Sequence, residues 1–299
     1  MPSRPLVLRP SAKINLNLRV GSRHVDGFHD VTTLLQSIAI SDTVSITPRV
    51  GPFGLLCRSP GVPDDRTNLV WRAAEVLWRA MGRSGAPRDA HIKLDKQIPV
   101  AAGLGGGSAD AAAALAGLNT VWNARQSPRA LLGLAAELGS DVPFFLIGGT
   151  AVGLGRGSEL YPVDDVARMG VIVIKPSFGV AARDAYAWLD ERRAAGGEPS
   201  EPAPARQEID VGWPTGPVVL ANDLQIPVAR RHPMVDEMIN ACAREGALGA
   251  SMSGSGSAVF GVFPEAVARR AVGRLQRPDW LVLLTRTLAR REAVRRMGL

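Results

Sequence analysis

The chain has 299 residues, and its hydrophobic content of 46% provides enough apolar material for one large domain or two ordinary ones. We expect neither a membrane span nor a signal peptide. The chain has two cysteines, Cys57 and Cys242, which are far apart in the sequence. They argue against a zinc cluster and against a disulfide framework, and they favour a cytoplasmic protein. The net charge of +7 favours a polyanionic partner, either a nucleic acid or a phosphorylated small molecule.

Strict alternation of apolar and polar residues predicts a half-buried strand over residues 11–20. Lys13 and Asn15 lie side by side on the polar face of this strand. An ordinary surface strand explains the pattern equally simply, so this segment by itself assigns no role to either residue.

A turn is predicted at Asp26-Gly27, with Phe28 and His29 just beyond it. A single loop histidine is more often incidental than functional, so His29 alone indicates little. The elements expected next are a strand over residues 31–40, a strand over 43–47, and a Gly- and Pro-rich loop over 51–65 with at most one short strand.

An amphipathic helix is predicted over residues 69–81, and we expect its capping residue in the preceding pair Thr67-Asn68. A short strand over residues 91–94 comes next. Lys96 leads from that strand into a loop rich in glycine.

The glycine-rich loop is the strongest single signal in the sequence. It comprises Pro99, Val100, Ala101, Ala102, Gly103, Leu104, Gly105, Gly106, Gly107, Ser108 and Ala109. Glycine tolerates positive φ and carries no side chain, so the backbone N–H groups of such a loop can face a bound anion. An alanine-rich helix is predicted over residues 110–121, with Ser108 or Asp110 as its cap, and its N-terminus suits phosphate. Neither G-x-x-x-x-G-K-[ST] nor G-x-G-x-x-G fits, but we favour phosphate binding over a flexible linker.

Another helix is predicted over residues 128–138, and Gly139 ends it. Asp141 then introduces the apolar run 142–146. This carboxylate is either the N-cap of a short helix or a catalytic group beside an apolar pocket, and the stretch alone favours the cap. A glycine-rich strand is expected over residues 148–157.

We expect the first domain to end near residue 158, which divides the chain into domains 1–157 and 158–299. Residues 194–207, rich in Pro, Gly, Ala and Glu, are expected to form a mobile insertion. A second glycine–serine loop is predicted over residues 249–257. The other elements expected in this half are strands over 170–175, 258–263 and 280–288, helices over 183–193, 233–244 and 265–275, and an element that begins at 222–224.

Three segments together resemble the GHMP kinase superfamily of small-molecule kinases, namely residues 13–15, 99–115 and 249–257. The superfamily's glycine loop has the form P-x-x-x-G-L-G-S/G-S/G-S/A-A, and residues 99–109 match it well. Residues 11–16, 26–29 and 140–145 narrow the resemblance to members that phosphorylate 4-diphosphocytidyl-2-C-methyl-D-erythritol. The resemblance runs from about Leu8 to Phe263.

The resemblance implies an α+β fold made of α/β two-layer sandwiches. The N-terminal domain would be ribosomal-protein-S5-like, the C-terminal domain a smaller α+β unit, and the active site would lie in the cleft between them. ATP would donate its γ-phosphate to the 2-hydroxyl of the substrate, with Mg²⁺ bridging the phosphate oxygens.

The resemblance also implies roles for individual residues. Lys13 and Asp141 would be the catalytic pair, and Pro99 to Ala109 would cradle the phosphates of ATP. Asn68 and Lys96 would lie near the adenosine. The residues that face the substrate would be Asn15, Phe28, His29 and Asp141, with His29 at the cytosine. The chemistry agrees, because Asp141 can accept the hydroxyl proton while Lys13 orients it and stabilises charge on the γ-phosphate. No carboxylate near Ser108 matches the superfamily's metal-binding position, so no protein metal ligand is expected.

Two alternatives stay open. Another GHMP kinase would act on homoserine, mevalonate or a sugar, but the Asp-Gly-Phe-His segment and residues 140–145 argue against it. A non-catalytic nucleotide- or nucleic-acid-binding protein would explain the basic charge. However, aromatic residues make up only 5% of the chain, and the densest arginine cluster, residues 286–296, is expected to form a helix with a solvated basic face. We therefore expect a small-molecule substrate, no nucleic-acid partner, and a monomer or weak homodimer.

Overall fold

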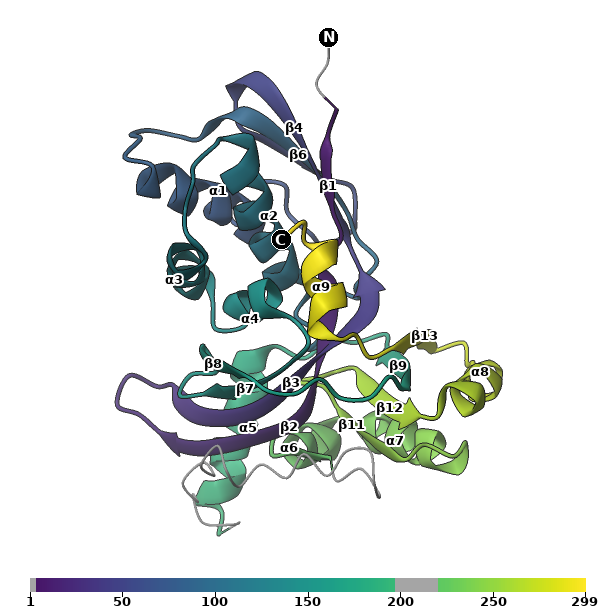
Figure 1. Cartoon of the computed structure of the whole chain (residues 1–299). Helices are drawn as coiled ribbons and strands as arrows, with labels where there is room; N and C mark the ends of the chain where they lie inside the picture. The colour runs from purple at the N-terminus through teal and green to yellow at the C-terminus, as the bar shows by residue number, and fades with distance from the viewer. Residues whose placement is uncertain (1–3, 197–219) are drawn as a thin grey trace.

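Three β-sheets with packed helices make up the fold of the computed structural model, which describes residues 4–196 and 220–299 (Figure 1). The first sheet has the order β1 (Leu6–Leu8), β4 (Thr43–Pro52), β6 (Arg88–Asp95), β5 (Gly54–Cys57). The second has the order β10 (Ala221–Asn222), β2 (Ser11–Arg23), β3 (His29–Ser41), β7 (Thr150–Leu154), β8 (Glu159–Pro162). The third has the order β11 (Gly249–Met252), β12 (Val259–Phe263), β9 (Gly170–Pro176), β13 (Trp280–Arg286).

The helices lie against these sheets. Those of the first half are α1 (Leu69–Ala80), α2 (Gly106–Val121), α3 (Pro128–Leu138) and α4 (Val142–Ile147). Those described in the second half are α5 (Ala182–Ala194), α6 (Gln225–Arg231), α7 (Met234–Arg244), α8 (Glu265–Arg274) and α9 (Arg290–Arg296). In Figure 1, α1, α2 and α3 gather beside β4 and β6, whereas α7 and α8 lie beside the third sheet.

Helix α2 is buried along most of its length, because its small side chains allow close approach on every side. The ten residues from Ala109 to Leu118 are all buried. At Gly117 an added Cβ would lie 2.4 Å from Cδ1 of Ile46 on β4, so the glycine brings the helix against the sheet. This packing fixes the N-terminus of α2, and with it the glycine loop.

The long hairpin of β2 and β3 connects the parts of the molecule. The two strands pair antiparallel from Ser11↔Ser41 to Arg23↔His29, and an isolated bridge joins Ile38 to Thr287 just beyond the third sheet. One buried cluster contains residues from both halves of the chain, for example Leu35 and Phe260. The domain division at residue 157 stays a prediction.

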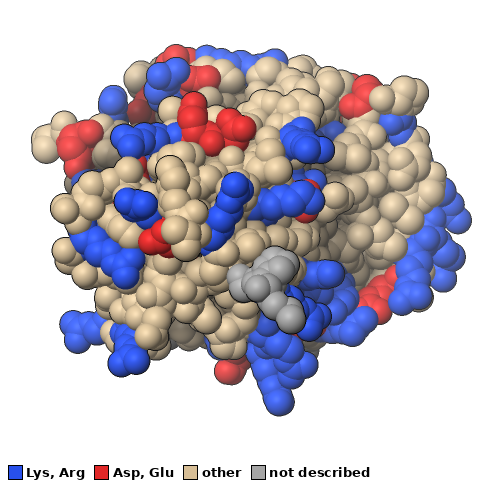
Figure 2. Space-filling view, turned by 90° about the horizontal axis from the view of Figure 1, so that it is seen from above, with Lys and Arg blue, Asp and Glu red and all other residues tan. Residues whose placement is uncertain are grey.

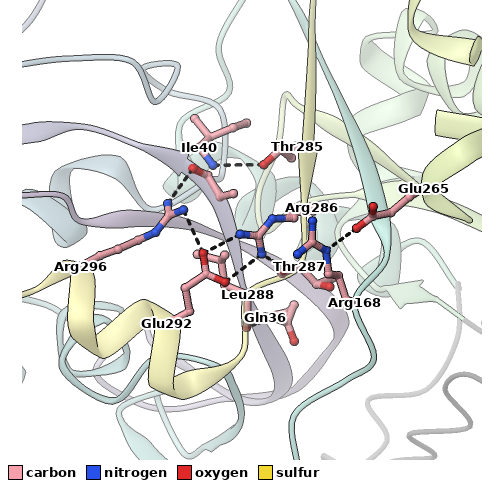
Figure 3. A network of polar contacts seen from close by, with 11 residues as sticks. Gln36, Ile40, Arg168, Glu265, Thr285, Arg286, Thr287, Leu288, Glu292 and Arg296 are labelled. Carbon is pink, nitrogen blue, oxygen red and sulfur yellow. Dashed lines mark hydrogen bonds and ion pairs between the residues drawn. The ribbon is translucent and has the colours of Figure 1, made fainter. Parts of the chain in front are cut away.

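The C-terminal helix α9 folds back onto the first half of the chain. Arg286 makes a forked pair with Glu292, with N–O distances of 2.6 and 2.9 Å, and Arg296 donates to Ala39 O at 3.1 Å (Figure 3). An added Cβ at Gly148, which directly follows α4, would lie 2.7 Å from the Cβ of Ala293 on α9. The expectation of a solvated basic face is therefore wrong for the inner arginines of this segment, which brace the helix against the second sheet.

Most expected elements are present, with ends that differ by a few residues. Two of the expected elements differ in kind or in where they begin. The helix after the glycine loop begins at Gly106 rather than residue 110, and the first part of the second glycine–serine loop, Gly249–Met252, is strand β11. The predicted insertion over residues 194–207 lies outside the described residues from residue 197 onward.

Positive charge is spread widely over the surface. Figure 2 shows Lys and Arg side chains over one face, densest toward its right-hand and lower edges, in line with the net charge of +7. Within the two described ranges, no helix combines the length and apolar character needed to cross a membrane.

Candidate active site

A cavity of about 1010 Å³ brings together the central residues predicted from the sequence. The predicted residues that line it are Lys13, Asn15, Phe28, His29, Gly103, Gly105, Ser108 and Asp141. Those that do not line it are Asn68, Lys96, Pro99, Val100, Ala101, Ala102, Leu104, Gly106, Gly107 and Ala109. The cavity therefore contains the predicted catalytic pair, the predicted base-binding residues and part of the glycine loop.

Lys13 and Asp141 approach each other in this cavity from different elements. The Nζ of Lys13 lies 3.6 Å from Oδ2 of Asp141, and it donates a hydrogen bond of 2.7 Å to Oδ1 of Asn15. Asn15 in turn donates to Oγ1 of Thr33 at 2.8 Å. The Lys13 side chain is 5% exposed but that of Asp141 is 41% exposed, so a fixed ammonium faces an accessible carboxylate.

Asp141 stands at the N-cap position of α4, but its side chain makes no capping hydrogen bond. The interpretation of this residue as a cap is therefore confirmed for its position, but its side chain does not cap the helix. Pro143 in the first turn favours helix initiation by itself. The carboxylate is left available for Lys13 and the cavity.

The glycine loop needs glycine at Gly103 and Gly105, which adopt φ values of 74° and 73°. An added Cβ at Gly103 would lie 2.0 Å from Ser253 O, and one at Gly105 would lie 2.6 Å from Cζ of Phe145. The loop is also tied to the strand that carries Lys13, since Lys13 N donates to Leu104 O at 3.0 Å.

The second glycine–serine loop contacts the first one. Oγ of Ser253 donates to Gly103 O at 3.0 Å, and Asn222 Nδ2 donates to Met252 O and Gly254 O at 2.7 and 2.8 Å. An added Cβ at Gly254 would lie 3.2 Å from Nζ of Lys13. Both loops therefore converge on Lys13, and the buried Asn222 holds the second loop in place.

Helix α2 begins within the glycine loop, at Gly106, with Gly105 at its N-cap position and no side-chain capping bond. The prediction that Ser108 or Asp110 caps the helix is wrong. The amides of the first turn lack partners within a helix, and they carry the positive end of its dipole. A 16-residue helix with an uncapped N-terminus beside Lys13 suits a bound phosphate chain.

Lys96 lies behind the loop, between two buried carboxylates. Its Nζ donates to Oδ2 of Asp42 and, at 2.6 Å, to Oδ2 of Asp110. The other oxygen of Asp42 accepts from the backbone N–H groups of Gln97 and Ile98, at 2.5 and 2.8 Å. Oδ1 of Asp110 is buried without a hydrogen-bond partner. This Asp42–Lys96–Asp110 triad anchors the chain where it enters the glycine loop.

Burial dominates the electrostatics of this triad. It raises the pKa of Asp110 well above the ordinary value of 3.8, although the ammonium of Lys96 opposes the shift. Burial alone would lower the pKa of Lys96, but the charges of Asp110 and Asp42 outweigh it and the pKa is raised. The ammonium is therefore retained, and it is committed to contacts within the protein.

Asn68, the other residue expected near the adenosine, is the N-cap of α1. Its Oδ1 accepts from Val70 N at 2.9 Å, and its Nδ2 donates to Pro63 O at 2.6 Å. The expected capping role is confirmed. A place beside adenosine stays a prediction for both Asn68 and Lys96.

His29 lies in the same cavity as Lys13, at the start of β3. Its Nε2 is 2.8 Å from Oδ1 of Asp190, and its ring stacks on Tyr186 with centroids 5.2 Å apart and an interplanar angle of 27°. Phe28 is 55% exposed, and the guanidinium of Arg156 covers its ring at 4.4 Å. Aromatic surface and hydrogen-bonding groups thus occur together, as a flat heterocyclic ligand would require.

The comparisons with known proteins agree with this geometry. The models for the GHMP kinases N terminal domain and the GHMP kinases C terminal match residues 68–149 and 207–278. The 4-diphosphocytidyl-2-C-methyl-D-erythritol kinase of Pelotomaculum thermopropionicum is 41% identical over 282 residues, which cover 92% of this chain and 96% of that protein. This chain belongs to the 4-diphosphocytidyl-2-C-methyl-D-erythritol kinase family of GHMP kinases.

Two further comparisons support the assignment of this chain to that family. The enzyme of the same name from Moorella thermoacetica is 41% identical over 95% of this chain and 99% of its own length. A crystal structure of a 4-(cytidine 5'-diphospho)-2C-methyl-D-erythritol kinase matches 94% of this chain and 99% of its own with a TM-score of 0.73 and 30% identity. The predicted GHMP kinase fold and the prediction of an ATP-dependent phosphotransferase are confirmed, and the non-catalytic alternative is set aside.

The fold is shared beyond this family. A homoserine kinase from Cytophaga hutchinsonii matches 96% of this kinase with a TM-score of 0.71 but only 17% identity, which shows the common fold alone. The acceptor substrate must therefore be argued from residues that line the cavity.

Sequence reasoning about the kinase missed Tyr186, Asp190, Asn222 and Asp42. Tyr186 and Asp190 lie on α5, four residues apart, a spacing that indicates one helix face and no chemistry. Burial raises the pKa of Tyr186 to about 12, with the charge of Asp141 adding to the shift, so the phenol stays protonated at neutral pH. No local signal connects either residue to His29.

Proposed function

We propose that this kinase transfers the γ-phosphoryl group of ATP to the 2-hydroxyl of 4-diphosphocytidyl-2-C-methyl-D-erythritol. The observation that carries the proposal is the meeting of Lys13, Asp141 and two glycine loops in the cavity that also contains His29 and Tyr186. The proposed substrate is the one in the names of the relatives. The cavity contains side chains suited to both ends of that substrate, the polyol and the base.

In this proposal Asp141 accepts the proton of the 2-hydroxyl as that oxygen attacks the γ-phosphorus, while the bond from the γ-phosphorus to the bridging oxygen breaks and ADP leaves. Its half-exposed carboxylate can reach a ligand, whereas the buried Lys13 is held by Asn15. The ammonium of Lys13 orients Asp141 and offsets the charge that develops on the transferred phosphoryl group. Phosphoryl transfer passes through a loose transition state, so positioning and charge stabilisation supply most of the catalysis.

The glycine loop, residues 99–109, would hold the phosphates of ATP through the backbone amides at the start of α2. Gly103 and Gly105 line the cavity and carry no side chain, so the backbone is exposed to a ligand there. Within the described ranges, no group of three or more His, Cys, Asp or Glu residues is placed to hold a metal ion. Mg²⁺ would therefore be held mainly by phosphate oxygens, whose negative charge it neutralises.

The cytosine would lie beside His29, with Phe28 and Tyr186 providing aromatic surface, and Asn15 would face the polyol. Asn68 and Lys96 are our candidates for the neighbourhood of the adenosine. Their polar groups are engaged inside the protein, so we expect contact through Lys96's methylene groups and the backbone. We also propose a cytoplasmic enzyme that is a monomer or weak homodimer.

The position of the new phosphate tests the proposal. Carbon 2 of the methylerythritol carries a methyl group and no hydrogen, so a phosphate on its oxygen has no three-bond coupling to a proton. We expect a new singlet in the proton-coupled ³¹P NMR spectrum of the product. A doublet or triplet would place the phosphate on another hydroxyl and contradict the proposal, as would the absence of any new phosphomonoester.

A further inference from the structure

His29 is held by a carboxylate that lies outside the expected set of site residues. Its side chain is only 4% exposed, and its Nε2 lies 2.8 Å from Oδ1 of Asp190 on α5. The other oxygen of Asp190 lies 3.8 Å from Nη1 of Arg23 at the end of β2. Asp190 therefore stands between the hairpin and α5, and both it and His29 line the cavity.

This contact determines how His29 meets a ligand. An ionised carboxylate only accepts hydrogen bonds, so the nitrogen that faces Asp190 must carry a proton. In the neutral imidazole, Nδ1 is then the acceptor. The stacking of the ring on Tyr186 restricts rotation, so Nδ1 is presented in a fixed direction.

We propose that Asp190 is a positioning and specificity residue, which holds His29 with Nδ1 as a hydrogen-bond acceptor for the base of the substrate. The inference rests on the proposed function, in which His29 lies beside the base. Among pyrimidine nucleotides, an acceptor at Nδ1 favours cytosine, because cytosine carries an amino donor at carbon 4 where uracil carries a carbonyl oxygen. A carbonyl oxygen opposite Nδ1 would place two acceptors against each other, which disfavours a uridine-linked substrate.

A double-mutant cycle between Asp190 and His29 tests this role. We expect Asp190→Ala to raise KM for the cytidine-linked substrate about tenfold, the effect of one misplaced hydrogen bond. Because the contact involves binding rather than the reacting atoms, kcat and KM for ATP should stay within about twofold of the wild type. In a His29→Ala background, Asp190→Ala should raise KM no further, since the residue acts through His29.

The specificity readout uses the uridine diphosphate analogue of the substrate. We expect wild-type enzyme to prefer the cytidine compound, and Asp190→Ala to lose most of that preference. The control is Asp184→Ala, which removes a carboxylate from the same helix outside the cavity lining and should leave both KM values unchanged. Asp190→Asn, which keeps the volume and one oxygen, should fall between the wild type and Asp190→Ala, and it carries the same test if Asp190→Ala does not fold.

The inference is overturned if Asp190→Ala leaves KM and the cytidine preference unchanged, or if it raises KM equally with and without His29. A wild-type enzyme that consumes no ATP with the cytidine-linked compound would instead contradict the proposed function itself. The two failures are therefore distinguishable.

Discussion

Two lysine–aspartate arrangements lie beside the glycine loop, and they differ in burial and geometry. Lys96 is enclosed between two carboxylates whose side chains are 0% and 3% exposed. Lys13 lies 3.6 Å from Asp141, a carboxylate that is 41% exposed. The buried arrangement fixes the backbone that enters the loop, whereas the open one leaves a carboxylate free to meet a ligand. Similar residue types thus form a buried anchor in one place and, in our proposal, the catalytic pair in the other.

The largest expected effect comes from removing the reactive carboxylate. We expect Asp141→Asn to lower kcat by about 10³-fold, within the range of a lost general base. Because the side chain is half exposed and caps nothing, the melting temperature and ATP binding should stay near those of the wild type. Steady-state kinetics and calorimetric ATP titration measure the two effects. Near-wild-type turnover would remove Asp141 from the mechanism.

The second effect falls on stability. Lys96→Met removes the cation from between Asp42 and Asp110, and we expect the free energy of unfolding to fall by about 3 kcal/mol, as when a buried pair loses one partner. Lys93→Met is the matched control, because the pair of Lys93 with Asp95 is exposed and should contribute little. Urea unfolding of both variants measures the difference. Equal stabilities would show that the buried triad is no anchor.

The third prediction concerns the glycine loop, which lies close to both lysines. Gly105→Ala forces a side chain onto a residue with φ of 73° and against the ring of Phe145, so the loop amides must shift. We expect KM for ATP to rise about tenfold, the equivalent of one lost hydrogen bond to a charged group.

Gly133→Ala is the control for this substitution, since an added Cβ there contacts nothing within 4 Å. Alanine in helix α3 should stabilise the protein by about 0.5–1 kcal/mol and leave KM for ATP unchanged. An ATP KM that is unaffected by Gly105→Ala would contradict the assignment of the phosphate loop.

The smallest expected effect is a pH dependence of the free energy of unfolding, which comes from the buried triad. The pKa of Asp110 is raised in the folded state by burial, so over the interval from 3.8 up to the folded value the unfolded chain is ionised while the folded chain retains the proton. Stability from this group is therefore present below pH 3.8 and is lost as the pH rises through the folded pKa. We expect the unfolding free energy of the wild type, minus that of Asp110→Asn, to decrease from pH 4 upward. A constant or increasing difference would contradict the assignment.

The sequence predicted the reactive arrangement better than the anchoring one. The strand with Lys13, the glycine loop and the segment of Asp141 carry recognisable local patterns, and the structure brings them together. Asp42 lies 54 residues from Lys96, and Asp190 lies 161 residues from His29, so these contacts depend on tertiary packing. No periodic pattern or capping rule in the sequence indicates these contacts.

The incorrect capping prediction has a similar cause. Ser108 and Asp110 suit a helix start by residue type, but Gly105 already provides the turn into α2 in a left-handed conformation. Asp110 is then carried into the interior, where Lys96 is its partner. The arginines near the C-terminus show the same limit, because only the fold reveals Arg286 and Arg296 meeting at Glu292 (Figure 3).

The most direct test is a coupled assay of ADP release with four acceptors: 4-diphosphocytidyl-2-C-methyl-D-erythritol, homoserine, mevalonate and galactose. We predict ADP release with the cytidine-linked compound alone, because the proposed base site of His29, Tyr186 and Asp190 lies in the cavity that contains Lys13 and Asp141. Release with one of the other three, or with none of the four, would contradict the proposed function.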